Sequence, residues 1–232
     1  MIDTQDITGL VLAGGRGVRM GGVDKGLQNF HGVPLAQHAL ARLQPQVGTL
    51  LLNANRNAAI YAALGALYGA PVWPDGLTDS TDSTDSTNYA GPLAGFLTGL
   101  KHCRTPWLLT VPCDTPLFPR DLAARLAAAV VRDGSDMAMA TASTAQDDAA
   151  SAPCSNACTR LRPQPVFSLL RANLLQNLQH FTQGGGRKIQ AWAMQQRCSL
   201  VAFDHPGDDA RSFFNTNTLA QLQQLEQSEP SA

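Results

Sequence analysis

Short apolar runs alternate with longer helical patterns between Ile7 and Val131, and this alternation constrains the fold more than any other feature of the sequence. The apolar runs lie at residues 7–12, 47–53, 70–73 and 107–111, and their length is typical of buried strands. The helical patterns are LAQHALARL with Pro34 at its first position, residues 57–68, LAGFLTGLKHC after Gly91, and residues 119–131. This order predicts an α/β protein with a three-layer, Rossmann-like fold, in which a mostly parallel sheet has helices on both faces.

The second half of the chain carries similar elements at wider spacing. We predict a strand at residues 165–170, a helix at about 173–181, a strand at 200–203 and a last helix after Asn217. The segment GGGRK at 184–188 is predicted to be a cationic loop.

Two polar segments interrupt the pattern, at about residues 78–88 and 143–160. Their composition cannot bury a core, so we predict flexible insertions at both places. Residues 1–232 are expected to form a single domain, with an N-terminal half at about 7–131 and a C-terminal half at about 136–225.

Charge and cysteine usage exclude several classes of protein. The formal net charge is −1, so there is no overall basic field for nucleic acid or an anionic membrane. The N-terminus MIDTQD lacks the regions of a signal peptide, and no apolar run reaches the roughly 20 residues that cross a bilayer. The five cysteines are odd in number and scattered, which argues against a disulfide framework, and Cys154 and Cys158 have no second pair to complete a zinc site. We therefore expect a cytoplasmic monomer without nucleic-acid or membrane partners.

The stretch LAGGRGVRMGGVDKG, residues 12–26, holds six glycines and three basic residues directly after the first predicted strand. Such a turn lies at the carboxyl edge of the sheet, where ligands of open α/β sheets bind. Glycine amides can form an anion nest, and Arg16, Arg19 and Lys25 suit phosphate oxygens. The stretch fits neither a Walker P-loop nor G-x-G-x-x-G, so it predicts a phosphate loop of another kind. The alternative is a glycine-rich surface turn with incidental charges.

Polar residues also follow the other predicted strands. Asp114 comes after the run 107–111, and a carboxylate there suits Mg²⁺ bound together with substrate phosphates, although it could instead cap the next helix. Asn53 and Asp75 end on the same edge, and either could be a plain turn residue. Cys113 has no histidine beside it in sequence and is expected to be a small buried residue.

The loop sequence resembles that of the molybdenum cofactor guanylyltransferases, whose motif reads almost as this one through MGGVDKGL. Four further pieces match that family in order: NAN at 53–55, GPLAG at 91–95, PCDTP at 112–116 and FFNTNT at 213–218. The resemblance spans Ile7 to about Leu225 and thins in the two polar segments. Relatives often carry a histidine where this chain has Gln164, which bears on contacts to the pterin.

The resemblance implies a nucleotidyltransferase that joins GMP from GTP to the terminal phosphate of molybdopterin, with Mg²⁺ as cofactor. It implies that Lys25, Arg19 and Asp114 are catalytic, and that Asp114 binds the metal. The implied GTP-binding residues are Leu12, Ala13, Gly14, Gly15, Arg16, Lys25, Asn53, Asp75, Gly91, Gly95 and Asp114. The pterin acceptor is assigned to Arg162, Gln164, Arg187, Lys188, Asn215 and Asn217, of which the basic residues could equally be solvated surface.

Two alternatives stay open at this point. The first is a cytidylyltransferase acting on the same pterin, although its family shows Ala-Ala-Gly where this chain has Ala13-Gly14-Gly15. The second is a carrier that binds GTP or the cofactor without catalysis. The presence of Lys25 and Asp114, the implied catalytic residues, argues against a carrier. As further partners we expect transient contact with cofactor-delivering proteins or apo-molybdoenzymes.

Overall fold

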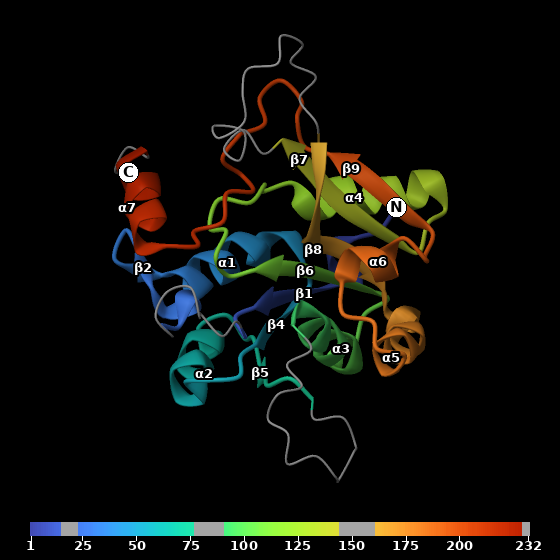
Figure 1. Cartoon of the computed structure of the whole chain (residues 1–232), viewed down its shortest axis with the longest axis horizontal. Helices are drawn as coiled ribbons and strands as arrows, with labels where there is room; N and C mark the ends of the chain where they lie inside the picture. The colour runs from blue at the N-terminus through green and yellow to red at the C-terminus, as the bar shows by residue number, and fades with distance from the viewer. Residues whose placement is uncertain (15–22, 77–90, 144–160, 229–232) are drawn as a thin grey trace.

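The computed structural model describes residues 1–14, 23–76, 91–143 and 161–228 (Figure 1). Its main feature is a seven-stranded sheet with the strand order β5-β4-β1-β6-β8-β7-β9. The strands are β1 (Ile7–Leu12), β4 (Thr49–Asn53), β5 (Val72–Trp73), β6 (Trp107–Pro112), β7 (Met137–Ser143), β8 (Leu161–Arg171) and β9 (Cys198–Ala202). A separate hairpin joins β2 (Asn29–Phe30) to β3 (Val33–Pro34).

The sheet is mostly parallel, as the sequence predicts. β1 pairs in parallel with both β4 and β6, with Leu12 opposite Asn53 on one side and Pro112 on the other. The carboxyl ends of these three strands therefore lie together. Only β8, among the described strands of this sheet, runs the other way, antiparallel to β6 and β7.

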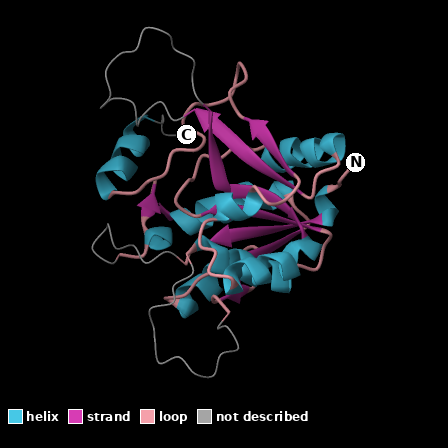
Figure 2. Cartoon of the chain, turned by 45° about the vertical axis from the view of Figure 1, so that its right-hand side comes forward, coloured by secondary structure: helices cyan, strands magenta, loops and turns pink. Residues whose placement is uncertain are grey.

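Helices cover both faces of the sheet (Figure 2). Side chains of α1, α2 and α4 join one buried cluster, and those of α3, α5 and α6 join another. The helices are α1 (Leu35–Leu43), α2 (Ala58–Ala66), α3 (Pro92–His102), α4 (Leu122–Asp133), α5 (Leu175–Gln183), α6 (Ile189–Ala193) and α7 (Leu219–Ser228). Short 3₁₀ turns lie at η1 (Thr4–Asp6), η3 (Lys25–Leu27), η4 (Gln44–Gln46) and η6 (Ala172–Leu174). In the described part of the chain, we find no helix long and apolar enough for a membrane span.

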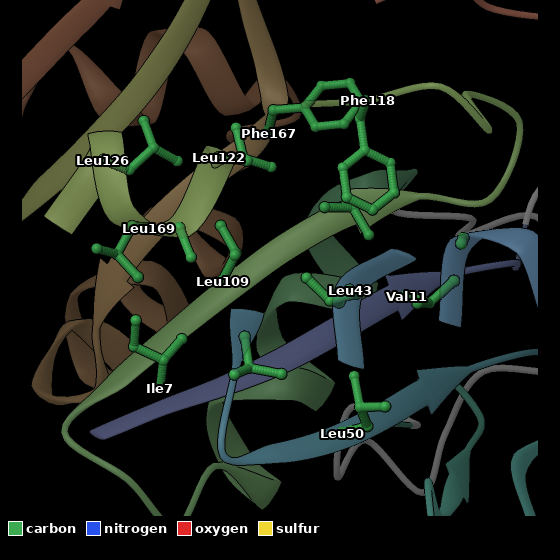
Figure 3. Packing of buried hydrophobic residues seen from close by; sticks show 14 of the residues in the cluster. Ile7, Val11, Leu43, Leu50, Leu109, Phe118, Leu122, Leu126, Phe167 and Leu169 are labelled. Atoms are coloured by element: carbon green, nitrogen blue, oxygen red, sulfur yellow. The ribbon is translucent and has the colours of Figure 1, made fainter. Parts of the chain in front are cut away.

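The larger cluster fixes α1 and α4 over the central strands (Figure 3). Val11 of β1 and Leu109 of β6 point to the same face, where Leu43 of α1 and Leu122 of α4 cover them. Each of these side chains is fully buried, and burial of a residue of this size contributes about 1.5–3 kcal/mol to the free energy of unfolding. The core thus holds rigid the strand ends that carry the polar loops.

The last helix, α7, packs at the carboxyl edge of the sheet. Its Leu222 and Leu225 join Phe30, Leu35 and Leu117 in a small buried cluster. Figure 1 shows α7 beside β2, on the side of the molecule away from α5 and α6. The end of the chain is therefore brought to the edge where the glycine-rich loop begins.

Some sequence predictions need correction. Pro34 is not the first residue of α1: it pairs with Asn29 in β3 and precedes the helix, which begins at Leu35. The segment from Met137 to Ser143 is a strand that no pattern predicts, because it is rich in alanine, which strands disfavour. It forms because β8 and β9 pair with it on both sides.

The strand predicted at 165–170 is longer, Leu161–Arg171, and it is antiparallel. Its pairing with β7 shifts register between Met139 and Ala140, and Pro165 falls at this irregularity. Neither Pro163 nor Pro165 pairs with β6, because β6 pairs only with residues 168–171 of β8. The predicted insertion at 78–88 lies outside the described residues, and so does the one at 143–160 except for Ser143, which ends β7. The single-domain organisation stays a prediction.

Candidate active site

Lys25 and Asp114 lie next to each other at the carboxyl edge of the sheet. Lys25 begins η3 after β1, and Asp114 follows the neighbouring strand β6. Lys25 Nζ lies 3.2 Å from Asp114 Oδ2 and donates a hydrogen bond of 2.9 Å to Asn217 Oδ1. The two charged side chains are 19% and 20% exposed, so the group is shielded but still reachable. Three of the predicted site residues are therefore brought together from distant parts of the chain.

Asn217 reaches this point because its segment is bound to the loop after β6. The Thr216 backbone N–H and the Thr216 hydroxyl both donate to the carbonyl oxygen of Asp114, at 2.9 and 3.0 Å. The Thr115 hydroxyl donates to Asn215 Oδ1 at 2.5 Å. Thr115 and Thr216 are both buried, which strengthens these contacts by excluding water.

The segment that carries Asn217 is also anchored to α4. The Arg125 guanidinium lies 2.8 Å from Asp208 Oδ1 and stacks 3.8 Å above the centre of the Phe203 ring. The Arg125 hydrogen bond lowers the pKa of the Asp208 carboxyl. Phe213 packs edge-on against Phe203 and Phe167. These contacts fix the path from β9 to Asn217.

A second polar network surrounds Asp75. Asn53, buried at the end of β4, donates through Nδ2 to the Trp73 carbonyl and to Asp75 Oδ1, both at 3.0 Å. Asn55 Nδ2 donates to Asp75 Oδ2 at 2.7 Å, and the Asp75 N–H donates to Asn55 Oδ1 at 2.7 Å. Both carboxylate oxygens of Asp75 are therefore held in a fixed orientation.

Glycines allow the neighbouring backbones to approach this network. A Cβ at Gly95 would lie 2.5 Å from Leu12 Cδ2 and 2.8 Å from Asn53 Oδ1, and a Cβ at Gly14 would lie 2.6 Å from Asn55 Nδ2. Gly91, which precedes α3, has φ +60, a conformation that favours glycine. Beside them, the Ala13 N–H donates to the Asn53 carbonyl at 2.8 Å.

The structure places the predicted acceptor residues on two other elements. Arg162 and Gln164 lie on β8 opposite Ala142 and Ala140 of β7, at the end of β8 that meets the carboxyl edge. Arg187 and Lys188 are exposed in the turn between α5 and α6, away from the hydrogen bonds that join Lys25, Asp114 and Asn217. Gly15, Arg16, Arg19, Cys154 and Cys158 lie outside the described residues.

Two members of the site carry no prediction from the sequence. Asn55 orients Asp75, and Thr216 binds the backbone of Asp114. Both stand inside the motifs NAN and FFNTNT, which are the signal that could have revealed them. Burial raises the pKa of the Cys113 thiol, and the Asp114 charge adds to this effect, so the environment of Cys113 disfavours the thiolate form.

Comparison with known proteins defines the class. A family model described as a MobA-like NTP transferase domain matches residues 9–199, which include most of β1, all of β4 and β6, and the Asp75 network. Together with the sheet order and the cation–carboxylate pair at its carboxyl edge, this match defines a nucleotidyltransferase.

Relatives narrow the class further. The molybdenum cofactor guanylyltransferase of Acidovorax ebreus is 62% identical over 226 residues, covering 97% of this chain and 98% of the relative. That of Bordetella pertussis is 52% identical over 226 residues, covering 97% and 100%. The chain belongs to the molybdenum cofactor guanylyltransferases.

Solved structures agree on the fold. Molybdopterin-guanine dinucleotide biosynthesis protein A from Archaeoglobus fulgidus has a TM-score of 0.66 at 20% identity, covering 95% of this chain and 97% of that one. The 4-diphosphocytidyl-2C-methyl-D-erythritol synthase from Anaerococcus prevotii has a TM-score of 0.67 at 10% identity, covering 97% and 98%. The predicted three-layer α/β nucleotidyltransferase fold is confirmed.

Proposed function

We propose that this protein transfers GMP from GTP to the terminal phosphate of molybdopterin and releases pyrophosphate. The product is the guanine dinucleotide form of the cofactor. The observation that carries the proposal is the group of Lys25, Asp114 and Asn217 at the carboxyl edge, in a chain of this family. The group presents one ammonium cation, which can bind triphosphate oxygens, and two side-chain oxygen atoms, which can coordinate a metal ion.

The reaction needs no covalent intermediate with the protein. An oxygen of the terminal phosphate of molybdopterin attacks the α-phosphorus of GTP and forms a new P–O bond. The bond from that phosphorus to the bridging oxygen of the β-phosphate breaks, and pyrophosphate leaves with the electron pair. Such transfers depend on positioning and on neutralisation of negative charge, which Lys25 supplies together with Arg19 and Arg16 of the same loop.

The residues around Lys25 suit Mg²⁺. The ammonium group lies within 3.2 Å of both Asp114 Oδ2 and Asn217 Oδ1, so a cation already stands between two hard oxygen atoms. Mg²⁺ binds through one or two carboxylates plus substrate phosphates, and Asp114 would hold it with Asn217 beside it. When bound, the ion would neutralise phosphate charge. The described residues show no group of three or more His, Cys, Asp or Glu side chains for a metal.

The base and ribose are assigned to the Asp75 network. Guanine presents N1–H and an amino group as neighbouring donors, whereas the Watson–Crick edge of cytosine presents only one donor. Each carboxylate oxygen of Asp75 has accepting capacity beyond the single hydrogen bond from Asn53 or Asn55. The pocket is assigned to Leu12, Ala13, Gly14, Gly15, Asn53, Asp75, Gly91 and Gly95.

The pterin phosphate is assigned to the cationic and amide side chains of the second half. These are Arg162, Gln164, Arg187, Lys188, Asn215 and Asn217. We further propose that the protein works as a monomer in the cytoplasm, with transient contacts to cofactor-delivering proteins or apo-molybdoenzymes.

The test is pyrophosphate release by the purified protein with molybdopterin, Mg²⁺ and one of GTP, CTP or ATP. We expect release with GTP, dependent on molybdopterin, and a guanine dinucleotide product by mass spectrometry. Release with CTP instead would support the cytidylyltransferase. Binding of GTP without release, under any of these conditions, would support a carrier and overturn the proposal.

A further inference from the structure

Asp24, next to Lys25 in sequence, is a buried carboxylate with only 9% of its surface exposed. Its Oδ1 accepts a hydrogen bond from the Tyr61 hydroxyl at 2.6 Å and another from the Gly26 N–H at 3.2 Å. Its Oδ2 accepts from Asn57 Nδ2 at 2.9 Å. Burial of a carboxylate is costly unless donors compensate it, and here three neutral donors do so.

Two of these donors come from the N-terminal end of α2 and the residue just before it. Asn57 precedes the helix and Tyr61 lies one turn later, so both side chains point in the same direction. Asn57 takes a left-handed conformation with φ 51, which asparagine tolerates better than most residues. Tyr61 is fully buried, and burial together with the Asp24 hydrogen bond raises the pKa of its hydroxyl, which stays a donor.

Gly26, on the other side of Lys25 in sequence, packs closely against Tyr61 and Cys113. A Cβ at this position would overlap the Tyr61 hydroxyl and would lie 3.3 Å from Cys113 Sγ. The residues on both sides of Lys25 are therefore pressed against α2 and the loop after β6. This leaves the Lys25 side chain to extend toward Asp114 and Asn217 from a fixed backbone.

The segment from Asn53 to Asn57 serves both networks of the site. Asn53 and Asn55 at its start orient Asp75, and Asn57 at its end binds Asp24. A short segment between β4 and α2 thus connects the proposed base pocket to the catalytic lysine.

We propose that Asp24 is a positioning residue for Lys25, held by Asn57 and Tyr61, and that it sets the rate of guanylyl transfer without touching either substrate. This inference rests on the proposed function, because its kinetic readout is that transfer. Loss of one Asp24 contact lets the η3 backbone move and misplaces the ammonium group. Preorganised electrostatic groups lose effect when they must reorganise during the reaction.

The kinetic test uses two mild substitutions. Tyr61→Phe removes one donor, and Asn57→Gly removes another while keeping a residue that accepts a positive φ. Each is expected to lower kcat about tenfold, the effect of one hydrogen bond, with KM for GTP within about twofold of the parent value. Tyr68→Phe, the same change two residues after the end of α2, is the matched control and should leave kcat unchanged.

The decisive arm repeats both substitutions in a Lys25→Ala background. If Asp24 acts through Lys25, each should then change kcat by less than about twofold. Equal losses in both backgrounds would show a general structural role and overturn the proposal. So would unchanged kcat in the parent background.

A second measurement, the chemical reactivity of Lys25, does not depend on guanylyl transfer. Lys25 is labelled with an amine-reactive reagent, with Lys101 of α3 as internal reference, and the sites are quantified by mass spectrometry. Labelling of Lys25 is expected to rise about threefold or more in Tyr61→Phe and Asn57→Gly, because local mobility exposes the amine. Unchanged labelling would overturn the positioning role. A parent protein that releases no pyrophosphate would overturn the proposed function alone.

Discussion

Lys25 and Asn217, 192 positions apart in the chain, are joined by a hydrogen bond of 2.9 Å from the lysine ammonium to the asparagine amide oxygen. The lysine belongs to the first loop of the sheet, and the asparagine to the segment just before the last helix. Phosphate loops are commonly discussed as local motifs. In this molecule the lysine of the loop is oriented by the segment that carries Asn217. Substitutions in that segment should therefore change the rate of guanylyl transfer.

We predict that Lys25→Ala lowers guanylyl transfer roughly 10²–10³-fold, the usual effect of one preorganised electrostatic group. The melting temperature should change little because the side chain belongs to none of the buried hydrophobic clusters. The measurement is kcat/KM for GTP from pyrophosphate release. Lys101→Ala, an exposed lysine on α3, is the control and should keep parental turnover. Near-normal turnover of Lys25→Ala would contradict the assignment.

We predict that Asp114→Asn lowers the rate at every Mg²⁺ concentration, because the substitution removes the charge that would hold the ion but keeps the side-chain volume. GTP should still bind weakly through the Asp75 network. The measurement is a Mg²⁺ titration of the transfer rate for variant and parent. Overlapping titration curves would exclude Asp114 as the metal ligand.

We predict that Gly14→Ala weakens the preference for GTP over CTP roughly 10- to 100-fold. The added Cβ would lie 2.6 Å from Asn55 Nδ2, the atom that donates to Asp75 Oδ2. A misplaced hydrogen bond between Asp75 and a base that is buried on binding costs about 1–3 kcal/mol, which gives this range. The measurement is the ratio of kcat/KM values with the same pterin acceptor. An unchanged ratio would place base selection elsewhere, and a parent that prefers CTP would contradict the guanylyltransferase function itself.

We predict that Asp208→Asn lowers the melting temperature at pH 7 by about 2–4 °C, equivalent to about 1 kcal/mol in a chain of this size. The hydrogen bond from Arg125 lowers the folded-state pKa of Asp208, so the ionised carboxylate stabilises the fold above the unfolded-state pKa of about 4. This contribution is lost as the pH falls through the lowered folded-state pKa. The difference between parent and variant should therefore shrink in melting curves recorded from pH 5 down to pH 2.5. A difference that stays constant over this range, or Asp204→Asn behaving in the same way, would contradict the assignment.

The sequence predicts the first half of this molecule well because parallel strands leave their carboxyl ends at one edge. Asn53 ends a predicted strand, and Lys25, Asp75 and Asp114 each follow one. Their common edge can therefore be inferred from the alternation of strands and helices alone. Asn217 does not follow a predicted strand, and only the motif FFNTNT, which contains it, indicated that it belongs to the site. Thr216 and Asn55 act through internal hydrogen bonds rather than charge, and residue type alone does not reveal such roles.

The second half was less predictable for reasons of packing. The alanine-rich β7 becomes a strand because its two neighbours pair with it, a tertiary effect that overrides local preference. The direction of β8 also depends on its partners, because an apolar run does not reveal whether it runs parallel or antiparallel. The functional roles assigned to all of the site residues stay predictions, those of Arg16 and Arg19 included.

The contact between Gly26 and Tyr61 has a consequence for how this family can diverge. A side chain at position 26 would overlap the Tyr61 hydroxyl, and that hydroxyl donates a hydrogen bond to Asp24. Position 26 therefore cannot gain a side chain freely while Tyr61 is kept. Among homologues, the two should covary as a pair: a residue larger than glycine at position 26 should occur with a smaller residue at position 61, and such lineages should need another donor for the carboxylate at position 24.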